Sequence, residues 1–286
     1  MTRKSLFHFA VVGLLWGIPY LLMKVAVEDF PPAAVVAGRT LIGAAILIPI
    51  ALYRKKFNGA VLGFKYVAFY ALMEMIGPWI LITTAEKEID SGLAGLLVST
   101  VPIFATIITS LRGDHSVWQF KRIFGIIVGF IGLILVVGIE SLSGNSDPLS
   151  IAMVIVASMG YAYAVIMVTT NLPLVDGIAI NGLAMAITTI FWAPVAIAQW
   201  PSSISLKSAV SLLALGIFST AFAFILFFKV IAELGPARSS LVTYLNTAIA
   251  VVLGVIILKE PLTVGIIVGL PLVLVGSYLA SRKTSA

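Results

Sequence analysis

Two ionisable residues lie deep inside apolar stretches of the sequence, where a charge is costly. Glu74 lies near the middle of the stretch 64–85, and Arg39 lies about six residues, or roughly 9 Å, inside the stretch 33–53. An ionisable group inside a bilayer marks a functional site by default, because it must pair, meet water or change its protonation. Glu74 is therefore a candidate for proton coupling or for holding a substrate ammonium group, and Arg39 is a candidate for attracting a substrate carboxylate.

Each of these charges also has a purely structural explanation. Glu74 would be a fixed charge if it paired with a basic side chain such as Arg39, and Arg39 could instead extend its head group to the membrane interface. The equivalent positions in the second half of the chain hold Ala221 and Ala184, so neither charge is repeated. On this asymmetry we favour a functional role for Glu74, and we leave function and structure equally open for Arg39.

Aromatic and amide side chains at similar depth could line a central substrate cavity. Aromatic residues near helix ends usually form an interfacial belt, but Trp16, Tyr161 and Tyr163 are deeper. Tyr20 and Tyr163 also occupy matched positions in the two halves. Aromatic walls with a few polar groups suit a zwitterion or an amphipathic amine. The candidate substrate-binding residues are Trp16, Tyr20, Arg39, Tyr70, Glu74, Trp79, Tyr161, Tyr163, Tyr244 and Asn246.

The composition indicates a membrane protein. Of the 286 residues, 60% are hydrophobic and 10% are charged, whereas about a quarter of a soluble chain is charged. The sequence has no cysteine and two histidines, which excludes disulfides and thiolate chemistry and leaves few ligands for a metal. Motifs for phosphate loops, zinc proteases and serine nucleophiles are absent. We therefore expect no metal site, no cofactor and no enzymatic activity, since Glu74 alone does not supply paired catalytic groups.

Uncharged apolar runs predict the helices that must position these residues. About 20 apolar residues cross a bilayer as a helix, and we interpret the first run as a retained helix rather than a signal peptide. The predicted fold class is an all-α polytopic membrane protein with ten transmembrane helices. These are expected at 6–27, 33–53, 64–85, 91–111, 122–139, 149–170, 178–198, 208–231, 238–258 and 262–281.

The two halves of the sequence resemble each other at an offset of about 143 to 147 residues. Each half would hold five helices, and an odd number forces the halves into opposite membrane orientations. Inverted repeats of this kind are common in secondary transporters, with the substrate between the repeats. We expect a first repeat at 1–141 and a second at 148–286. The matches are 48–51 with 193–196, Glu86 with Glu233, Gly125 with Gly269 and Gly132 with Gly276.

The distribution of Lys and Arg predicts the orientation. Most of these residues at helix ends fall on the side of the N-terminus, whereas the opposite side has Lys87, Lys207 and Lys259. Because cytoplasmic loops carry the excess of positive charge, we expect a multi-pass protein of the cell membrane with both termini in the cytoplasm. The loops 86–90 and 140–148 would then be external. This bias also explains the net charge of +6 without any nucleic-acid partner.

Three motifs resemble the EamA-type branch of the drug/metabolite transporter superfamily. They are Gly-Leu-Leu-Trp-Gly at 13–17, Gly-Arg-Thr-Leu at 38–41 and Ile-Leu-Lys-Glu-Pro-Leu-Thr at 257–263. The resemblance covers essentially the whole chain, and it implies ten helices in two inverted five-helix repeats and, usually, export of small metabolites such as amino acids. The family favours a proline in the fourth helix and at the matching position of the ninth. This chain has Pro102 in the fourth helix but Thr247 in the ninth, which departs from the family pattern.

The sequence therefore predicts a secondary transporter that works by alternating access between the two repeats. Its most favoured substrates are small organic metabolites that it exports, such as amino acids or amphipathic amines. Among transporters, the alternative is an anion or sugar-phosphate antiporter. Such a protein would require two or more basic residues deep in the membrane, and Arg39 is the one that is clearly deep. A membrane scaffold or receptor is the alternative outside transport. The expected partners are a small-molecule substrate and the lipid bilayer, and the protein would be a monomer or a homodimer.

Single cysteines at Ser143 and Ser285 should be labelled from opposite sides of the membrane by an impermeant thiol reagent. The chain has no cysteine of its own, so each signal reports the introduced residue alone. Both positions should react after the membrane is permeabilised, which controls for burial. Labelling of both positions from the same side in intact cells would contradict the count of ten helices.

Overall fold

The protein is entirely helical in the part of the chain that the computed structural model describes. Residues 3–113, 119–142, 147–234, 239 and 241–281 are described, and they contain no strand. Seven segments among them are long and apolar enough to cross a membrane, and two shorter apolar helices, Val242–Leu258 and Val264–Leu279, follow. The prediction of an all-α multi-pass membrane protein is thus confirmed, whereas the inverted repeat of ten helices stays a prediction.

The helices of the first half coincide with the apolar runs of the sequence. Two of the predicted ranges, 64–85 and 91–111, each contain more than one element because the helix changes its geometry along the way. The elements are α1 (Arg3–Ala26), α2 (Pro32–Tyr53), α3 (Phe57–Leu62), α4 (Phe64–Ala71), the π-helical turn η1 (Leu72–Ile76), α5 (Gly77–Ala85), α6 (Ser91–Val98), α7 (Val101–Leu111) and α8 (Phe120–Leu142).

The second half shows the same pattern, with two further π-helical turns inside its apolar segments. Its elements are α9 (Pro148–Asn171), α10 (Gly177–Ala198), α11 (Leu206–Ala214), the π-helical turn η3 (Leu215–Phe222), α12 (Ala223–Leu234), α14 (Val242–Leu253), the π-helical turn η4 (Gly254–Leu258) and α15 (Val264–Ser281).

Short polar side chains determine where several of these helices begin. The carboxylate of Asp147 accepts from the backbone N–H of Ser150 at 2.8 Å, and that of Asp176 accepts from Ile178 at 2.9 Å. Each bond satisfies a backbone donor that the first turn of a helix leaves free. Helices α9 and α10 therefore begin directly after these two aspartates, which interrupt the apolar runs.

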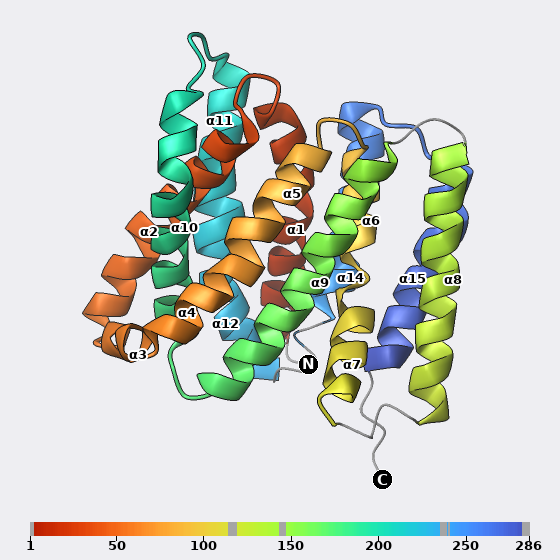
Figure 1. Ribbon diagram of the computed structural model, residues 1–286, viewed down its shortest axis with the longest axis horizontal. Coiled ribbons are helices and arrows are strands. Elements are labelled where there is room, and N and C mark those ends of the chain that lie inside the picture. Colours follow the sequence, from red (N-terminus) through yellow and green to blue (C-terminus); the bar gives the residue numbers. More distant parts are fainter. Residues whose placement is uncertain (1–2, 114–118, 143–146, 235–238, 240, 282–286) are drawn as a thin grey trace.

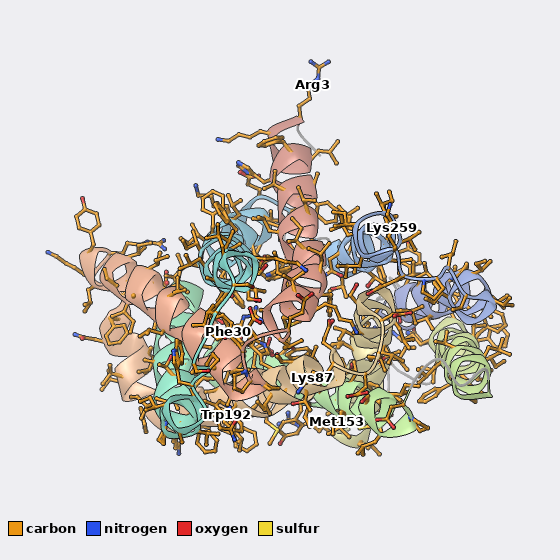
Figure 2. The ribbon with its side chains drawn as sticks, turned by 90° about the horizontal axis from the view of Figure 1, so that it is seen from above. Arg3, Phe30, Lys87, Met153, Trp192 and Lys259 are labelled. Carbon is orange, nitrogen blue, oxygen red and sulfur yellow. The ribbon has the colours of Figure 1, made fainter. Side chains whose placement is uncertain are left out.

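Four connections gather at one end of the bundle, which we call the upper end (Figure 1). They are the loops 27–31, 86–90, 199–205 and 259–263, and Figure 2 looks down on this end, with Phe30, Lys87 and Lys259 labelled. Side chains link the loops: Lys207 pairs with Glu28 at 2.9 Å, and Lys24 donates to the carbonyl of Ile89 at 2.7 Å. The charge distribution in the sequence predicts that the upper end is external.

A carboxylate at this end is held by the loop that precedes α11. Asp29 accepts hydrogen bonds from both the hydroxyl and the backbone N–H of Ser205, at 2.5 and 2.9 Å. These bonds keep the pKa of Asp29 below its ordinary value. The loop 27–31 is therefore tied to the start of α11 by an ionised side chain.

Several predictions concern residues outside the described part of the chain. The cysteine positions Ser143 and Ser285 lie there, as do residues 143–146 of the predicted external loop 140–148. The same is true of some of the basic residues that set the predicted orientation, namely Arg238, Arg282 and Lys283. Both termini belong to this group as well, so the orientation remains a prediction.

Helices α8 and α15 pack closely against each other at one edge of the molecule, on the right in Figure 1. Glycines make the approach possible: a Cβ at Gly276 would overlap the backbone of Gly129, and a Cβ at Gly132 would lie 2.8 Å from the backbone nitrogen of Val273. Small residues let membrane helices approach at backbone distance. The glycines that the sequence matched between the halves therefore meet in this one helix pair.

Gly276→Ala should destabilise the protein, because the added methyl group meets backbone that cannot rotate away. Overpacking of this kind costs about 1–3 kcal/mol, which should lower the thermal unfolding midpoint of the purified protein by several degrees. Val275→Ala is a matched control, since Val275 is exposed on the same helix. An unchanged midpoint for Gly276→Ala would show that α8 and α15 do not pack in this way.

Candidate functional site

Arg39 is buried in the middle of the bundle and contacts three other segments. Its side chain is 6% exposed, and its Nε and Nη2 donate to the hydroxyl of Thr220 at 3.2 and 3.1 Å. Its Nη1 lies 3.6 Å from the sulfur of Met23, and its Cζ lies 3.8 Å from the centroid of the Trp79 ring. The guanidinium is thus held inside the protein by α1, α5 and η3 and does not extend to the interface.

Three aromatic side chains surround this guanidinium. Trp79 provides the ring face, where a cation is attracted by the quadrupole of the indole, and its side chain hydrogen-bonds to Tyr161 of α9. Tyr20 of α1 is also buried, and both tyrosines interact electrostatically with Arg39. We call Tyr20, Met23, Arg39, Trp79, Tyr161 and Thr220 the Arg39 cluster.

Glu74 lies in the π-helical turn η1, which directly precedes α5, the helix whose Trp79 contacts the guanidinium. Its Oε2 is buried and has no hydrogen-bond partner among the described residues. Glu74 interacts electrostatically with Tyr70 and with Tyr161, which belongs to the Arg39 cluster. No ion pair joins Glu74 to Arg39 in the described structure.

Local features of the sequence explain why the helix loosens at Glu74. Pro78 follows the turn and has no backbone N–H, so it cannot close the usual bond to a carbonyl of the preceding turn. A π-helical turn leaves backbone groups to be satisfied elsewhere. The indole of Trp192 in α10 donates to the carbonyl of Ile76 at 3.1 Å. Gly160 lets α9 approach this turn, since a Cβ there would lie 2.8 Å from the carbonyl oxygen of Met73.

Tyr70 connects the same segment to α10. Its hydroxyl donates to the side-chain carbonyl of Asn181 at 3.1 Å, and Asn181 in turn donates to the carbonyl of Gly177. Tyr70 is buried, and Glu74 lies one helical turn further along the chain. The bond therefore holds the segment that carries Glu74 against α10.

The structure brings six of the ten candidate residues together and places the other four elsewhere. Trp16 packs on Phe227 with ring centroids 4.5 Å apart. Tyr163 is 36% exposed, with its ring beside Phe69. Tyr244 contacts Tyr278, and Asn246 accepts from the neighbouring hydroxyl of Thr247. The residues gathered around Arg39 and Glu74 are Tyr20, Arg39, Tyr70, Glu74, Trp79 and Tyr161.

Three polar partners in this region were not among the predicted site residues. Thr220 and Met23 contact the guanidinium, and Asn181 contacts Tyr70. Asn181 is an amide inside an apolar run, and that was a signal available in the sequence, whereas Thr220 is one of many hydroxyl residues in such runs. Met23 carries no such signal, because methionine is ordinary in an apolar helix.

In this arrangement a cation, Arg39, and a carboxyl group, Glu74, lie near the same aromatic side chain, Tyr161. We call the aromatic side chains around these two charges the aromatic framework. Three of the five N–H donors of the guanidinium contact Thr220 or Met23, and no carboxylate accepts from it in the described structure. The remaining donors suit a carboxylate, because the planar fork of arginine matches its geometry. A surface hollow of about 320 Å³ lies elsewhere, at the end of α2, and is lined by Leu52, Lys55, Phe57 and Asn58.

The apolar helices and the buried charged cluster define a multi-pass membrane protein with a polar centre. The chain belongs to the EamA-like transporter family, whose model matches residues 3–138 and again residues 148–282. The resemblance seen in the sequence motifs is thereby confirmed, and the two matches leave only residues 1–2, 139–147 and 283–286 uncovered.

Similar proteins extend over nearly the whole chain. The "Uncharacterized transporter YoaV" of Bacillus subtilis (strain 168) is 27% identical and covers 96% of both chains. The "Uncharacterized inner membrane transporter YedA" of Escherichia coli (strain K12) is 25% identical, over 94% of this chain and 90% of its own length. A solved structure titled "Crystal structure of protein" superposes with a TM-score of 0.66 at 16% identity, over 98% of this chain and 97% of its own. This likeness supports the helical fold.

Thr220→Val should destabilise the protein, because the guanidinium loses its only hydroxyl acceptor in the described structure while it stays charged. An unsatisfied buried donor costs about 1–3 kcal/mol, and thermal unfolding would measure the loss. Thr169→Val is the control, since that hydroxyl bonds only to its own helix. In the Arg39→Met background the effect of Thr220→Val should largely disappear. Equal effects in both backgrounds would contradict the contact.

Proposed function

We propose that this protein is a secondary transporter that exports small organic metabolites carrying both an ammonium and a carboxylate group, or an amphipathic amine. The observation that carries the proposal is that Arg39 and Glu74 lie on one aromatic framework without neutralising each other. Family membership and the transporter relatives support transport itself.

The guanidinium of Arg39 would bind the substrate carboxylate. It is buried, so its charge is little screened by water, and it has donors to spare beyond its contacts with Thr220 and Met23. The ring of Trp79 fixes its position by packing on one face. A bidentate contact would then orient the substrate relative to the aromatic side chains of the Arg39 cluster.

The carboxyl group of Glu74 would hold the substrate ammonium or a proton. Its buried oxygen has no donor in the described structure, and a carboxylate in that state is costly inside a membrane protein. An ammonium group would supply the missing donor, and a proton would remove the charge. If the two occupants exclude each other, binding of one releases the other, which couples the proton to the substrate.

Alternating access between the two halves would expose this site to each side in turn. The halves at 1–141 and 148–286, in opposite orientations, are supported by the repeated family match and by the repeated motifs. The polar cluster draws on both halves, with Arg39 and Trp79 from the first and Tyr161 and Thr220 from the second. Rocking of one half against the other would separate these contacts.

The remaining parts of the proposal follow from the charge distribution and the family. The protein would lie in the cell membrane with both termini in the cytoplasm and act as a monomer or a homodimer. A sugar-phosphate antiporter is less well supported, because Arg39 is the one arginine or lysine that the described structure places in the central polar cluster.

Glu74→Gln should abolish transport driven by a pH gradient and preserve exchange of substrate across the membrane. Purified protein in liposomes would be screened with labelled amino acids, cationic amines and phosphorylated sugars. The amide keeps the size of the side chain but cannot release a proton. Glu28→Gln is the control, since Glu28 is exposed and pairs with Lys207 at the upper end.

A second arm of the same assay tests the carboxylate contact. Arg39→Gln should reduce transport of an amino acid more than tenfold and that of the corresponding amine much less, because the amine has no carboxylate to lose. Wild-type transport by Glu74→Gln under a proton gradient would refute the coupling. Equal losses for both substrates in Arg39→Gln would refute the carboxylate site.

A further inference from the structure

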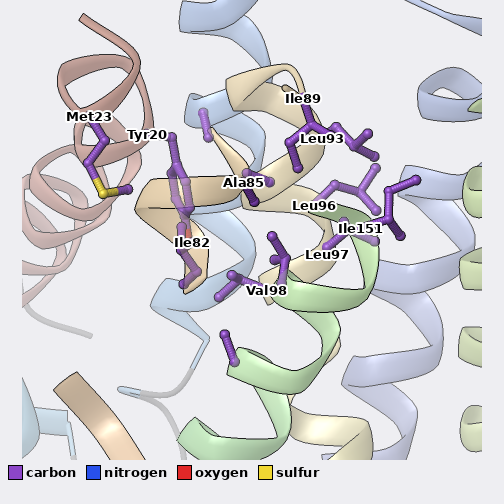
Figure 3. Close-up of a cluster of buried hydrophobic side chains, with 14 of the residues drawn as sticks. Tyr20, Met23, Ile82, Ala85, Ile89, Leu93, Leu96, Leu97, Val98 and Ile151 are labelled. Carbon is purple, nitrogen blue, oxygen red and sulfur yellow. The ribbon is translucent and has the colours of Figure 1, made fainter. Parts of the chain in front are cut away.

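A second carboxyl group, Glu86, is buried at the upper end of the bundle. It is the first residue after the apolar segment Phe64–Ala85 and ends α5. Figure 3 shows Ala85 and Ile89, which flank this residue in the chain, among the buried apolar side chains of α1, α5, α6 and α9. Glu86 itself is 0% exposed, which is unusual for a carboxylate in a connecting turn.

The carboxyl group of Glu86 has no hydrogen-bond donor in the part of the chain that the structure describes. Both of its oxygens are buried and unpartnered. The nearest cation, Lys24, donates to the carbonyl of Ile89 and makes no ion pair with Glu86 in that part of the chain. An ionised carboxylate in this position would therefore lose its hydration and gain no bond in return.

The neighbours of Glu86 add to this cost. The charged or titratable groups that interact with it electrostatically are Lys24 and Tyr20 from α1, Asp90 from its own loop and Glu260 from the loop after η4. If all three carboxyl groups were ionised, three negative charges would face one ammonium. Burial, followed by the repulsion from Glu260 and Asp90, raises the pKa of Glu86 well above its ordinary value.

Glu260, unlike Glu86, has hydrogen-bond donors for both of its carboxylate oxygens. It accepts from the backbone N–H groups of Ser91 and Gly92 at 2.8 and 3.1 Å and from the hydroxyl of Ser91 at 2.9 Å. These donors form the start of α6, where the helix dipole favours an anion. The backbone of Gly254 approaches the same carboxylate so closely that a Cβ would overlap it. Glu260 is thus bonded to the start of α6, whereas Glu86 has no donor, so a bound proton would relieve the cost of its burial.

We propose that Glu86 is a proton-binding site that closes the upper end of the transporter. With the proton bound, Glu86 packs as a neutral side chain between α1, α5 and the Glu260 contact, and this end stays closed. Opening of the end would admit water to the carboxyl group, which then releases its proton. The site would make opening at this end depend on the pH of the solution that the end faces.

A metal ion is the other occupant that a buried carboxyl group could bind. A metal site usually joins three or more acidic or histidine side chains, and no such group exists among the described residues. The oxygens of Glu260 are also already engaged by the start of α6. Both observations favour a proton over a metal.

Thermal unfolding of the full-length protein in detergent between pH 5 and pH 9 tests this proposal. Glu86 is protonated more readily in the folded than in the unfolded state, so the stability of a Glu74→Gln parent should fall as pH rises above the ordinary range of a glutamate. The unfolding equilibrium should shift by up to about tenfold per pH unit. Glu86→Gln mimics the protonated acid and should remove this fall. Glu88→Gln, an exposed carboxylate two residues away, should keep it.

The experiment is carried out in the Glu74→Gln background, so that the central carboxyl group does not contribute. It needs no substrate, and failure of the proposed transport mechanism would leave its outcome unchanged. Parallel curves for Glu86→Gln and its parent would refute the proposal. Stabilisation by sodium or potassium chloride at pH 8 that is lost in Glu86→Gln would also refute it, because a metal ion would then be the occupant.

A second measurement covers the case in which Glu86→Gln fails to fold. Infrared spectra of the Glu74→Gln parent should show the carbonyl band of a protonated carboxyl group at pH 7. Glu86→Asp should shift the position of that band, whereas Glu88→Asp should leave it unchanged. Absence of the band at pH 7 would refute the proposal without any variant at position 86.

Discussion

A permanent positive charge inside an apolar bundle requires partners, and the packing around Arg39 meets that requirement. The guanidinium cannot lose its proton and cannot lie against lipid, so hydroxyl, sulfur and aromatic groups must reach it from other helices. Thr220, Met23 and Trp79 do so from η3, α1 and α5. This one side chain therefore joins α1, α2, α5 and η3 through its contacts.

The sequence was sufficient to locate the helices and to identify the central charges. Apolar runs of bilayer length predict helices, and the predicted ranges 64–85 and 91–111 match the helical segments at both ends. The depth of a residue along a helix, however, does not determine towards which neighbour its side chain faces. Tyr161 turns towards Arg39, whereas Tyr163, two residues later, is partly exposed beside Phe69. The partners that Arg39 finds in other segments, such as Thr220, depend on how the helices pack, and a local sequence pattern does not predict that packing.

Two carboxyl groups in one segment have different environments. Glu74 lies beside tyrosines in the middle of the bundle, and Glu86 lies about 18 Å further along the helix, close to Lys24 and Glu260. Tyr70 and Tyr161 lie near Glu74, whereas a lysine and two further carboxyl groups lie near Glu86. A buried oxygen without a donor is common to both, and the charges of the neighbouring side chains distinguish them.

The π-helical turn η1 separates the face of α4 from that of α5 by one extra residue. An α-helix turns by about 100° per residue, and π-helical turns accommodate a single additional position within an otherwise regular helix. Loss of one residue between Leu72 and Ile76 would leave the segment helical and apolar, yet it would rotate Trp79 away from Arg39 and shift Glu86 relative to α1. The length of this segment is therefore under a stricter structural constraint than the identity of its exposed side chains.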